Sequence, residues 1–343
     1  MLERMQGFTG CIAEFDTGRP GKVTAYRFDI DCVPVTECTD DTHVPAKEGF
    51  ISKNPGFMHA CGHDAHMSMG LAVAHWVMDN KDKLSGKIKI LFQPAEEGVR
   101  GAAGMAASGI LDDCDYFLGS HVAMSAKSGE IATNLYGYLC TTKLDVTFHA
   151  SPLMPRCPQE GRNALTAAAN ATVQMMGISR HSGGMTRINI GQLIAGEGRN
   201  VIPSKAVMKL EVRGETGEIN QYMVDQVTNI CKGIAMSFGV TYEMRKMGEA
   251  VDLTADQELV DILNAAGRAT PGITVVDKAL NFGGSEDATI LARRVQAHGG
   301  KAAFFLWGSD RPSGHHTSTF DIKESDLDPA LEVWTHIIPA ILK

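Results

Sequence analysis

Apolar and polar positions in the first third of the chain form short apolar runs that alternate with longer helical stretches. The runs are bounded by turn residues, which is typical of buried strands. The same pattern returns near the C-terminus, where one more apolar run precedes an amphipathic segment. The predicted strands cover residues 22–30, 87–92, 116–120 and 302–307, and the predicted helices cover residues 65–78 and 326–342. This alternation predicts an α/β fold with a mostly parallel sheet flanked by helices.

The middle of the chain follows a different order. The predicted elements are a strand at 143–149, a helix at 162–177, strands at 186–194 and 204–213, a helix at 218–238 and a strand at 240–247. The order β-α-β-β-α-β is that of the split, ferredoxin-like motif. We therefore expect residues 142–250 to form an α+β module inserted into a discontinuous α/β domain of residues 1–141 and 251–343.

Composition and charge exclude several classes of protein. A length of 343 residues suggests about two domains. The net charge is 32 − 40 = −8, which argues against a nucleic-acid binder or a binder of anionic membranes. The sequence has no apolar run of transmembrane length and no apolar signal core at its start. Its eight cysteines show no framework spacing, so we expect a cytoplasmic protein.

The segment 58–66, MHACGHDAH, holds three histidines, a cysteine and an aspartate within nine residues. If this loop is extended, His59, Cys61 and His63 point to one side at period two. Thiolate and imidazole are good ligands for zinc, manganese and similar divalent ions. The alternative is a polar turn before the helix, with Cys61 as a small buried residue.

Further ligand types follow the predicted strands at their carboxyl ends. They are Asp29 and Asp31 after the first strand, Glu96 and Glu97 after the second, His121 after the third, and His315 and His316 after the last. The carboxyl ends of strands in open α/β sheets are where ligands bind. Convergence of these ends with the 58–66 segment predicts a metal centre, which we expect to be binuclear.

The adjacent pair Glu96 and Glu97 can supply two functions. Neighbouring side chains in a loop diverge, so one carboxylate can bind metal while the other takes and returns a proton. A solvated acidic turn is the plainer interpretation of this pair. A thiol hydrolase built on Cys61 and His63 is a further alternative, although the surrounding carboxylates and histidines favour metal ligation.

The motifs MHACGHDAH, QPAEEG, GSHV and the late GHH, together with GEGRNVIPSKAVMKLEVRGE, INQY and GSEDATIL, resemble the M20 metallopeptidase and amidohydrolase family, in particular its amidohydrolase branch. The resemblance runs along essentially the whole chain. It implies a binuclear metallohydrolase domain with an inserted lid and dimerisation domain. By the family pattern, Cys61 would bridge two metals, and the other ligands would be His63, Glu97, His121 and His316, the second of the two adjacent histidines.

The same resemblance implies roles for four more residues. Glu96 would be the general base, and Asp31 would orient the site. Asn200 and Arg213 match lid residues that hold the substrate's carbonyl and carboxylate, and a guanidinium fork suits bidentate capture of a carboxylate.

The implied reaction is metal-dependent hydrolysis of the amide bond in N-acyl amino acids, with p-aminobenzoyl-glutamate as the preferred substrate. The implied cofactors are two divalent ions per chain, Mn²⁺ or Zn²⁺. The implied partners are this small-molecule substrate and a second subunit, in a homodimer or in a heterodimer with a related chain through the lid domain.

Two departures from the family pattern motivate a second hypothesis. Members of this branch carry residues ahead of the point where this sequence starts, and loss of an edge element would expose apolar surface or a strand edge. The lid usually opens with an SHAG segment, but here residues 149–158 read HASPLMPRCP, one residue short, and His149 is not at the matching position. We hypothesise a local, compensated frameshift there. The alternative function is a catalytically impaired subunit that binds metal and ligand.

Overall fold

The computed structural model describes residues 9–150 and 161–343, and the chain divides into two compact units. Unit 1 comprises the described residues up to Gly137 and those from Leu253 onward, and unit 2 is the segment Tyr138–Asp252. Most of the altered lid opening, residues 151–160, lies outside the described residues. Within those two described ranges, no helix is long and apolar enough to cross a membrane.

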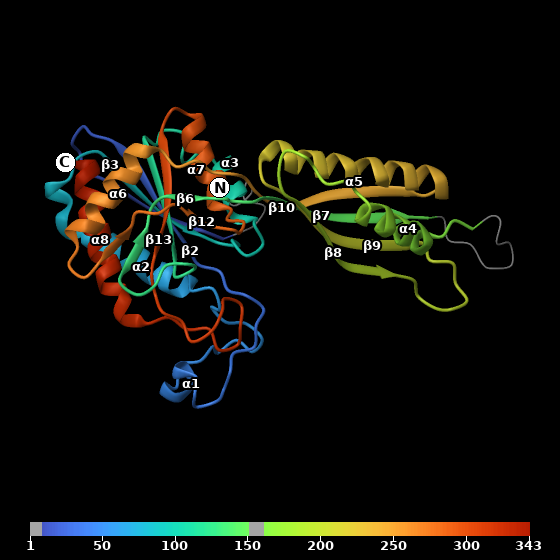
Figure 1. Ribbon diagram of the computed structural model, residues 1–343, viewed down its shortest axis with the longest axis horizontal. Coiled ribbons are helices and arrows are strands. Elements are labelled where there is room, and N and C mark those ends of the chain that lie inside the picture. The colour runs from blue at the N-terminus through green and yellow to red at the C-terminus, as the bar shows by residue number, and fades with distance from the viewer. Residues whose placement is uncertain (1–8, 151–160) are drawn as a thin grey trace. The chain divides into compact units, whose positions relative to one another are not determined.

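Unit 1 is built on a seven-stranded sheet (Figure 1). In order across the sheet, its strands are β1 (Cys11–Asp16), β3 (Lys87–Gln93), β2 (Val23–Asp29), β4 (Tyr116–Val122), β13 (Lys301–Trp307), β5 (Glu130–Ala132) and β11 (Thr274–Val276). The four strands from β3 to β13 are parallel to one another, whereas β1 runs antiparallel to β3 at one edge. The predicted α/β fold with a mostly parallel sheet is confirmed.

Helices cover both faces of this sheet. The helices of unit 1 are α1 (Val44–Glu48), α2 (His63–Asn80), α3 (Gly101–Ala107), α6 (Gln257–Ala269), α7 (Ala288–Ala297) and α8 (Leu327–Leu342). Helices α2, α6 and α8 pack together on one face, where Trp334 of α8 contacts Tyr26, Phe28 and Phe305. The preceding residue of β13, Phe304, faces the opposite side, which α3 and α7 cover. Strand alternation thus gives the sheet two buried faces.

Short elements complete unit 1. Two 3-10 turns, Lys81–Lys83 and Glu324–Asp326, flank α2 and α8, and strands β6 (Leu135–Tyr136) and β12 (Leu280–Asn281) pair in parallel. Strands of two or three residues are too short to show a period, so the sequence pattern did not predict them.

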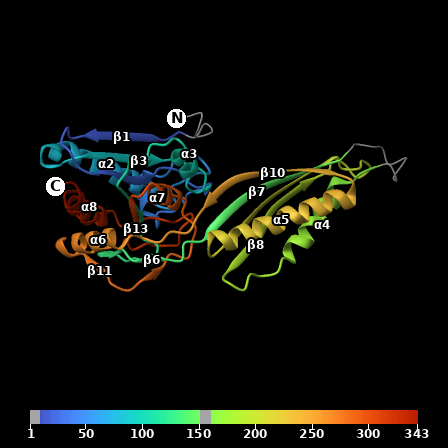
Figure 2. The same ribbon diagram turned by 90° about the horizontal axis from the view of Figure 1, so that it is seen from above.

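Unit 2 is a four-stranded antiparallel sheet with two helices on one face (Figure 2). Its elements are β7 (Cys140–His149), α4 (Ala164–Met176), β8 (Thr186–Ala195), β9 (Lys205–Gly214), α5 (Gly217–Phe238) and β10 (Thr241–Ala250), and the sheet order is β10-β7-β9-β8. Val146, Phe148 and Met208 turn towards α4 and α5 and form the core with their apolar residues. The predicted ferredoxin-like order is confirmed.

Side-chain caps fix where the two helices of unit 2 begin. The Asn163 side chain accepts a hydrogen bond from the amide of Thr166, and the Thr216 hydroxyl accepts one from the amide of Ile219. Such caps satisfy amides that the first helical turn leaves unpaired. The other face of the sheet carries polar side chains, because alternate residues of β9 are buried under the helices.

Candidate metal centre

The carboxyl ends of the central strands of unit 1 bring the predicted ligands together. Strand β2 ends at Asp29, β3 runs into the loop with Glu96 and Glu97, and β4 carries His121 near its end. Helix α2 begins at His63, directly after the turn that holds Cys61. The loop after β13 is tied to this turn by a 2.7 Å hydrogen bond from the His316 amide to the Ala60 carbonyl.

Two groups of candidate ligands share Cys61. In one group, the ligand atoms of Cys61, His63 and His121 lie within 4.8 Å of one another, and all three residues are buried. In the other, Cys61 lies equally close to Glu97 and His316. The Cys61 Sγ is 3.5 Å from His121 Nε2, and His316 Nε2 is 3.0 Å from Glu97 Oε1. A thiolate placed between two ligand groups is suited to bridging two cations.

The electrostatics of these side chains fit a cation. Burial, followed by the nearby Glu97, raises the pKa of the Cys61 thiol well above its usual range, so a positive charge is needed to hold the thiolate. Burial lowers the pKa of His121, which leaves the neutral imidazole that metals bind. The buried His63 Nε2 has no hydrogen-bond partner among the described residues. The donor set of thiolate, imidazole and carboxylate therefore fits divalent ions.

Left-handed backbone conformations concentrate around this cluster. Within residues 9–150 and 161–343, positive φ angles at residues other than glycine occur at Ala95, Val99, Ala123, Met124 and His316. Ala95 and Val99 flank the glutamate pair, the next two follow the His121–Val122 strand end, and His316 is itself a candidate ligand. Such conformations cost free energy and persist where the surrounding structure fixes them, as at functional sites.

A fully buried arginine lies behind the ligands. The Arg27 guanidinium donates to Asp29 Oδ2 at 2.8 Å, to Glu286 Oε1 at 2.9 Å and to Gln93 Oε1 at 2.8 Å. It also contacts Asp287 Oδ1 at 3.3 Å. We call these five residues the Arg27 network. A buried charge is stable only when its partners surround it, and this network provides them.

The Arg27 network holds the histidines through Asp29. Asp29 bonds to His66 Nδ1, and His66 Nε2 accepts from the amide of Val122, next to His121. Burial favours the protonated Asp29, but Arg27 and the histidines hold its pKa well below the usual range. Burial likewise opposes protonation of His63, yet Asp29 and Asp31 raise its pKa to about 9. A fixed negative charge therefore lies beside the candidate ligands.

Glu96 and Glu97 have different surroundings. Glu96 is buried, and its carboxylate lies within 4.8 Å of ligand atoms both of Glu286 and Asp287 and of His63 and Glu97. Burial, followed by Glu286 and Asp287, raises the pKa of Glu96 well above its usual range. A carboxyl with a raised pKa can accept and return a proton near neutral pH.

Asp31 ties the glutamate loop to His63. Its Oδ2 accepts from the amide of Glu97 at 3.0 Å, its Oδ1 lies 3.3 Å from His63 Nδ1, and its carbonyl oxygen is 3.0 Å from the same nitrogen. These contacts fix the ring orientation of His63 and leave Nε2 to face the cluster.

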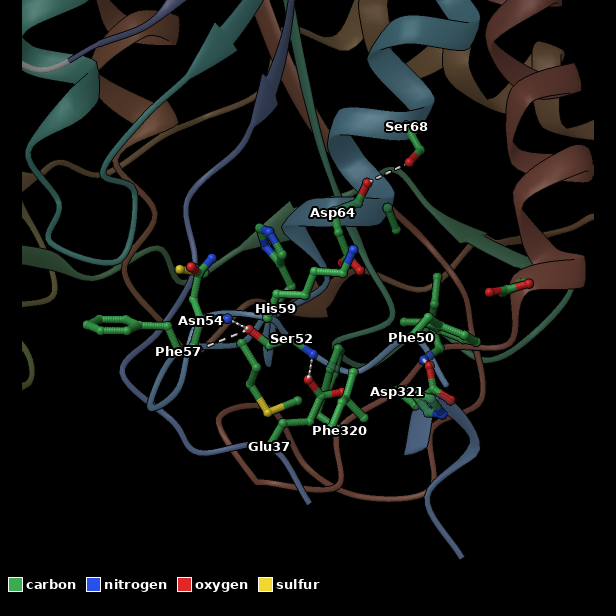
Figure 3. A pocket seen from close by; sticks show the side chains of 18 of the residues that line it. Glu37, Phe50, Ser52, Asn54, Phe57, His59, Asp64, Ser68, Phe320 and Asp321 are labelled. Atoms are coloured by element: carbon green, nitrogen blue, oxygen red, sulfur yellow. Dashed lines mark hydrogen bonds between the residues drawn. The ribbon is translucent and has the colours of Figure 1, made fainter. Parts of the chain in front are cut away.

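The expectation that His59 points with Cys61 and His63 is wrong. Residues 60–62 form a turn, Gly62 has φ +85°, and α2 already begins at His63, so period-two alternation does not apply. His59 instead lines a separate pocket of about 510 Å³ with Phe57, Asp64 and Phe320 (Figure 3).

The two lid residues predicted from the resemblance lie in unit 2. Arg213 is on the open face of β9, where its Nε and Nη2 are both 2.8 Å from Glu211 Oε1. Asn200 is exposed in the turn between β8 and β9 and does not line the pocket that contains Arg213.

Sequence reasoning missed the roles of Arg27, His66, Glu286 and Asp287. The available signal was charge at alternate positions of a buried strand, in Tyr26-Arg27-Phe28-Asp29, because an arginine inside such a strand requires buried carboxylate partners.

Comparisons with known proteins agree with this geometry. The sequence model of Peptidase family M20/M25/M40 matches residues 25–340. The chain is 54% identical over 342 residues to a p-aminobenzoyl-glutamate hydrolase subunit homolog from Haemophilus influenzae, covering 99% of this chain and 81% of that protein. It is 42% identical to an indole-3-acetyl-aspartic acid hydrolase from Enterobacter agglomerans, covering 95% of this chain and 75% of that protein. The crystal structure of an aminobenzoyl-glutamate utilization protein from Klebsiella pneumoniae is similar with a TM-score of 0.80 and 34% identity, covering 97% of this chain and 75% of that one.

Proposed function

Because this chain belongs to Peptidase family M20/M25/M40, we propose that it hydrolyses the amide bond of N-acyl amino acids with the help of bound metal ions. The observation that carries the proposal is the pair of ligand groups that share the buried Cys61, beside a buried Glu96. The preferred substrate is p-aminobenzoyl-glutamate, because a relative with 54% identity is named for that hydrolysis.

Two divalent ions, Mn²⁺ or Zn²⁺, would be held by Cys61, His63, Glu97, His121 and His316, with Cys61 shared between them. When bound, such ions lower the pKa of a coordinated water and polarise the substrate's carbonyl. Asp31 and the Arg27 network position the ligands, since they fix His63 directly and through Asp29.

Glu96 carries the proton in this proposal. It removes a proton from the attacking water, whose oxygen forms a bond to the amide carbon. It then delivers that proton to the amide nitrogen as the carbon–nitrogen bond breaks, which releases a carboxylic acid and an amine. The raised pKa of Glu96 suits both steps, because the group can hold the proton between them.

Unit 2 supplies substrate contacts and a subunit interface in this proposal. Arg213 would hold the substrate's carboxylate and Asn200 its carbonyl. Exposed apolar side chains on α4 and on the edge strand β8, such as Val173 at 74% and Ile194 at 57% exposure, support association with a second copy or a related subunit. The described cysteines are all free thiols, which supports a reducing compartment such as the cytoplasm.

The test is release of p-aminobenzoate from p-aminobenzoyl-glutamate by the purified, manganese-supplemented protein. Glu96→Gln should lower turnover by about 10²–10⁴-fold at unchanged metal content, because only the proton carrier is lost. Glu332→Gln, at an exposed carboxylate on α8, is the matched control and should retain full activity.

Other results would contradict the proposal. Equal turnover by wild type and Glu96→Gln would remove Glu96 from the reaction. Activity that survives chelation but not Cys61→Ser would indicate a thiol hydrolase. A folded chain with two ions bound and no turnover would favour the impaired-subunit alternative.

A further inference from the structure

A pocket of about 350 Å³ lies on the open face of the unit 2 sheet and is rich in arginine. We call it the arginine pocket, and its lining residues are Arg180, Thr186, Arg187, Ile188, Asn189, Glu211 and Arg213. It is formed by the edge strand β8, its neighbour β9 and the segment that follows α4.

Two of these arginines face each other across the strands. Arg187 of β8 is directly opposite Arg213 of β9, and Asn189 is opposite Glu211. Their neighbours Thr186, Ile188 and Val212 are buried, so the two arginines share the open face of the sheet. Opposed side chains have Cβ atoms about 5 Å apart, and like charges at that distance repel.

Elsewhere on the open face, charged residues are opposite partners of the other sign. Asp145 of β7 is opposite both Lys209 of β9 and Arg245 of β10. Lys143 of β7 is opposite Glu211. The Arg187–Arg213 pair differs from these three pairs, because it sets like charges against each other.

The charge of the arginine pocket is not balanced within it. Three guanidinium groups meet one carboxylate, that of Glu211, which is bound to Arg213. Arg180 and Arg187 are exposed and form no ion pair with the described part of the chain. The pocket therefore carries a net charge of +2 in a chain whose net charge is −8. A ligand with two carboxylates would neutralise it.

We propose that the arginine pocket binds both carboxylates of a dicarboxylic amino acid and so selects N-acyl glutamates and aspartates over neutral N-acyl amino acids. Arg213 holds the α-carboxylate, and Arg187 with Arg180 holds the side-chain carboxylate. The inference rests on the proposed function and deepens it. The names of the two relatives support it, since one contains glutamate and the other aspartic acid. Planar guanidinium groups bind carboxylates bidentately, which gives this choice geometric specificity.

The test compares kcat/KM for p-aminobenzoyl-glutamate with that for p-aminobenzoyl-glutamine, its neutral analogue of similar shape. Wild type should prefer the glutamate substrate, and Arg187→Gln should reduce that preference at least tenfold, with Arg187→Lys in between. Arg245→Gln is the matched control, because Arg245 is exposed on β10 at the opposite edge of the same sheet. An equal loss for both substrates, or an unchanged preference in Arg187→Gln, would overturn the inference.

A binding measurement separates this inference from the proposed function. Calorimetric titration with L-glutamate and L-glutamine requires no turnover. Preferential glutamate binding that Arg187→Gln abolishes would support the arginine pocket even if no amide were hydrolysed. Hydrolysis without preference for the acidic substrate would overturn the pocket and leave the proposed function standing. A wild type that neither hydrolyses the substrates nor prefers glutamate would overturn both.

Discussion

Arginines are central to two regions of this protein, and they are placed in opposite ways. Arg27 in unit 1 is completely buried and has three carboxylates and an amide oxygen around it. Arg187 in unit 2 is exposed and faces another arginine across the sheet. A buried charge must bring its partners with it, so the Arg27 network is complete within the fold. An exposed charge has water and salt to screen it, so the arginine pocket can leave its counter-charge to a ligand.

The largest effect should follow from removal of the buried charge. Arg27→Met leaves Asp29, Glu286 and Asp287 without their cation, and we expect unit 1 to lose about 3–5 kcal/mol of stability. Urea unfolding of the metal-free protein followed by tryptophan fluorescence measures this, because Trp76, Trp307 and Trp334 are all in unit 1. Arg245→Met, at an exposed arginine, should change stability by less than about 0.5 kcal/mol. Equal losses for the two variants would remove the distinction between buried and exposed arginine.

Metal removal should have the next largest effect on unit 1. A ligand at 100 times its Kd stabilises the folded state by about 2.7 kcal/mol, so a chelator should lower the thermal midpoint of the manganese-loaded protein. Cys61→Ser should remove most of this difference, since Cys61 belongs to both ligand groups. Cys11→Ser, at an exposed thiol on β1, should leave it intact. A midpoint that does not respond to the chelator would contradict the metal centre.

A smaller change should follow from loss of a positioning contact. Asp31→Asn weakens the support of His63 and of the Glu97 amide, and loss of such outer contacts costs metal affinity by roughly 10–100-fold. Competition titration with a chromophoric chelator gives the affinity, and Asp41→Asn at an exposed carboxylate serves as control. An unchanged affinity would show that the backbone alone holds the two ligands.

The smallest effect should be a gain in stability. Arg187→Gln removes a like-charge contact with Arg213, so unit 2 should become more stable by less than about 1 kcal/mol. Asp145→Asn removes opposite-charge contacts on the same face and should shift stability in the other direction. Hydrogen exchange of the β8 and β9 amides at low and high salt would measure both, and salt should diminish both. A loss of stability in Arg187→Gln would show that the arginine already has its partner.

Much of the fold could be predicted because its elements are long and periodic. The strands at 87–92 and 302–307 agree with β3 and β13 within one residue at each end, and the helix at 218–238 agrees equally well with α5. The start of α2 was placed two residues late, since the left-handed Gly62 allows the helix to begin directly after the Cys61 turn.

The candidate site could be predicted only in part. Strand order collects the strand ends, so Cys61, Glu97 and His121 could be expected in one place. The partners of Arg27 could not, because Glu286 is 259 positions away and nothing local links the two. Likewise, the Arg187–Arg213 contact depends on the register of β8 and β9, including an irregularity at Ile190 and Gln192 that a spacing pattern does not show.

The pairing of β7 with β10 has a consequence for how this protein can evolve. Thr141 and Ala250 are partners in that ladder, so unit 2 leaves and re-enters the chain through two neighbouring strands, about 4.8 Å apart. The segment Tyr138–Asp252 therefore behaves as a cassette whose two ends fit the same narrow gap. Exchanging it between relatives would replace the arginine pocket without lengthening or reconnecting the sheet that carries the cysteine and histidines, so specificity and chemistry can be inherited separately.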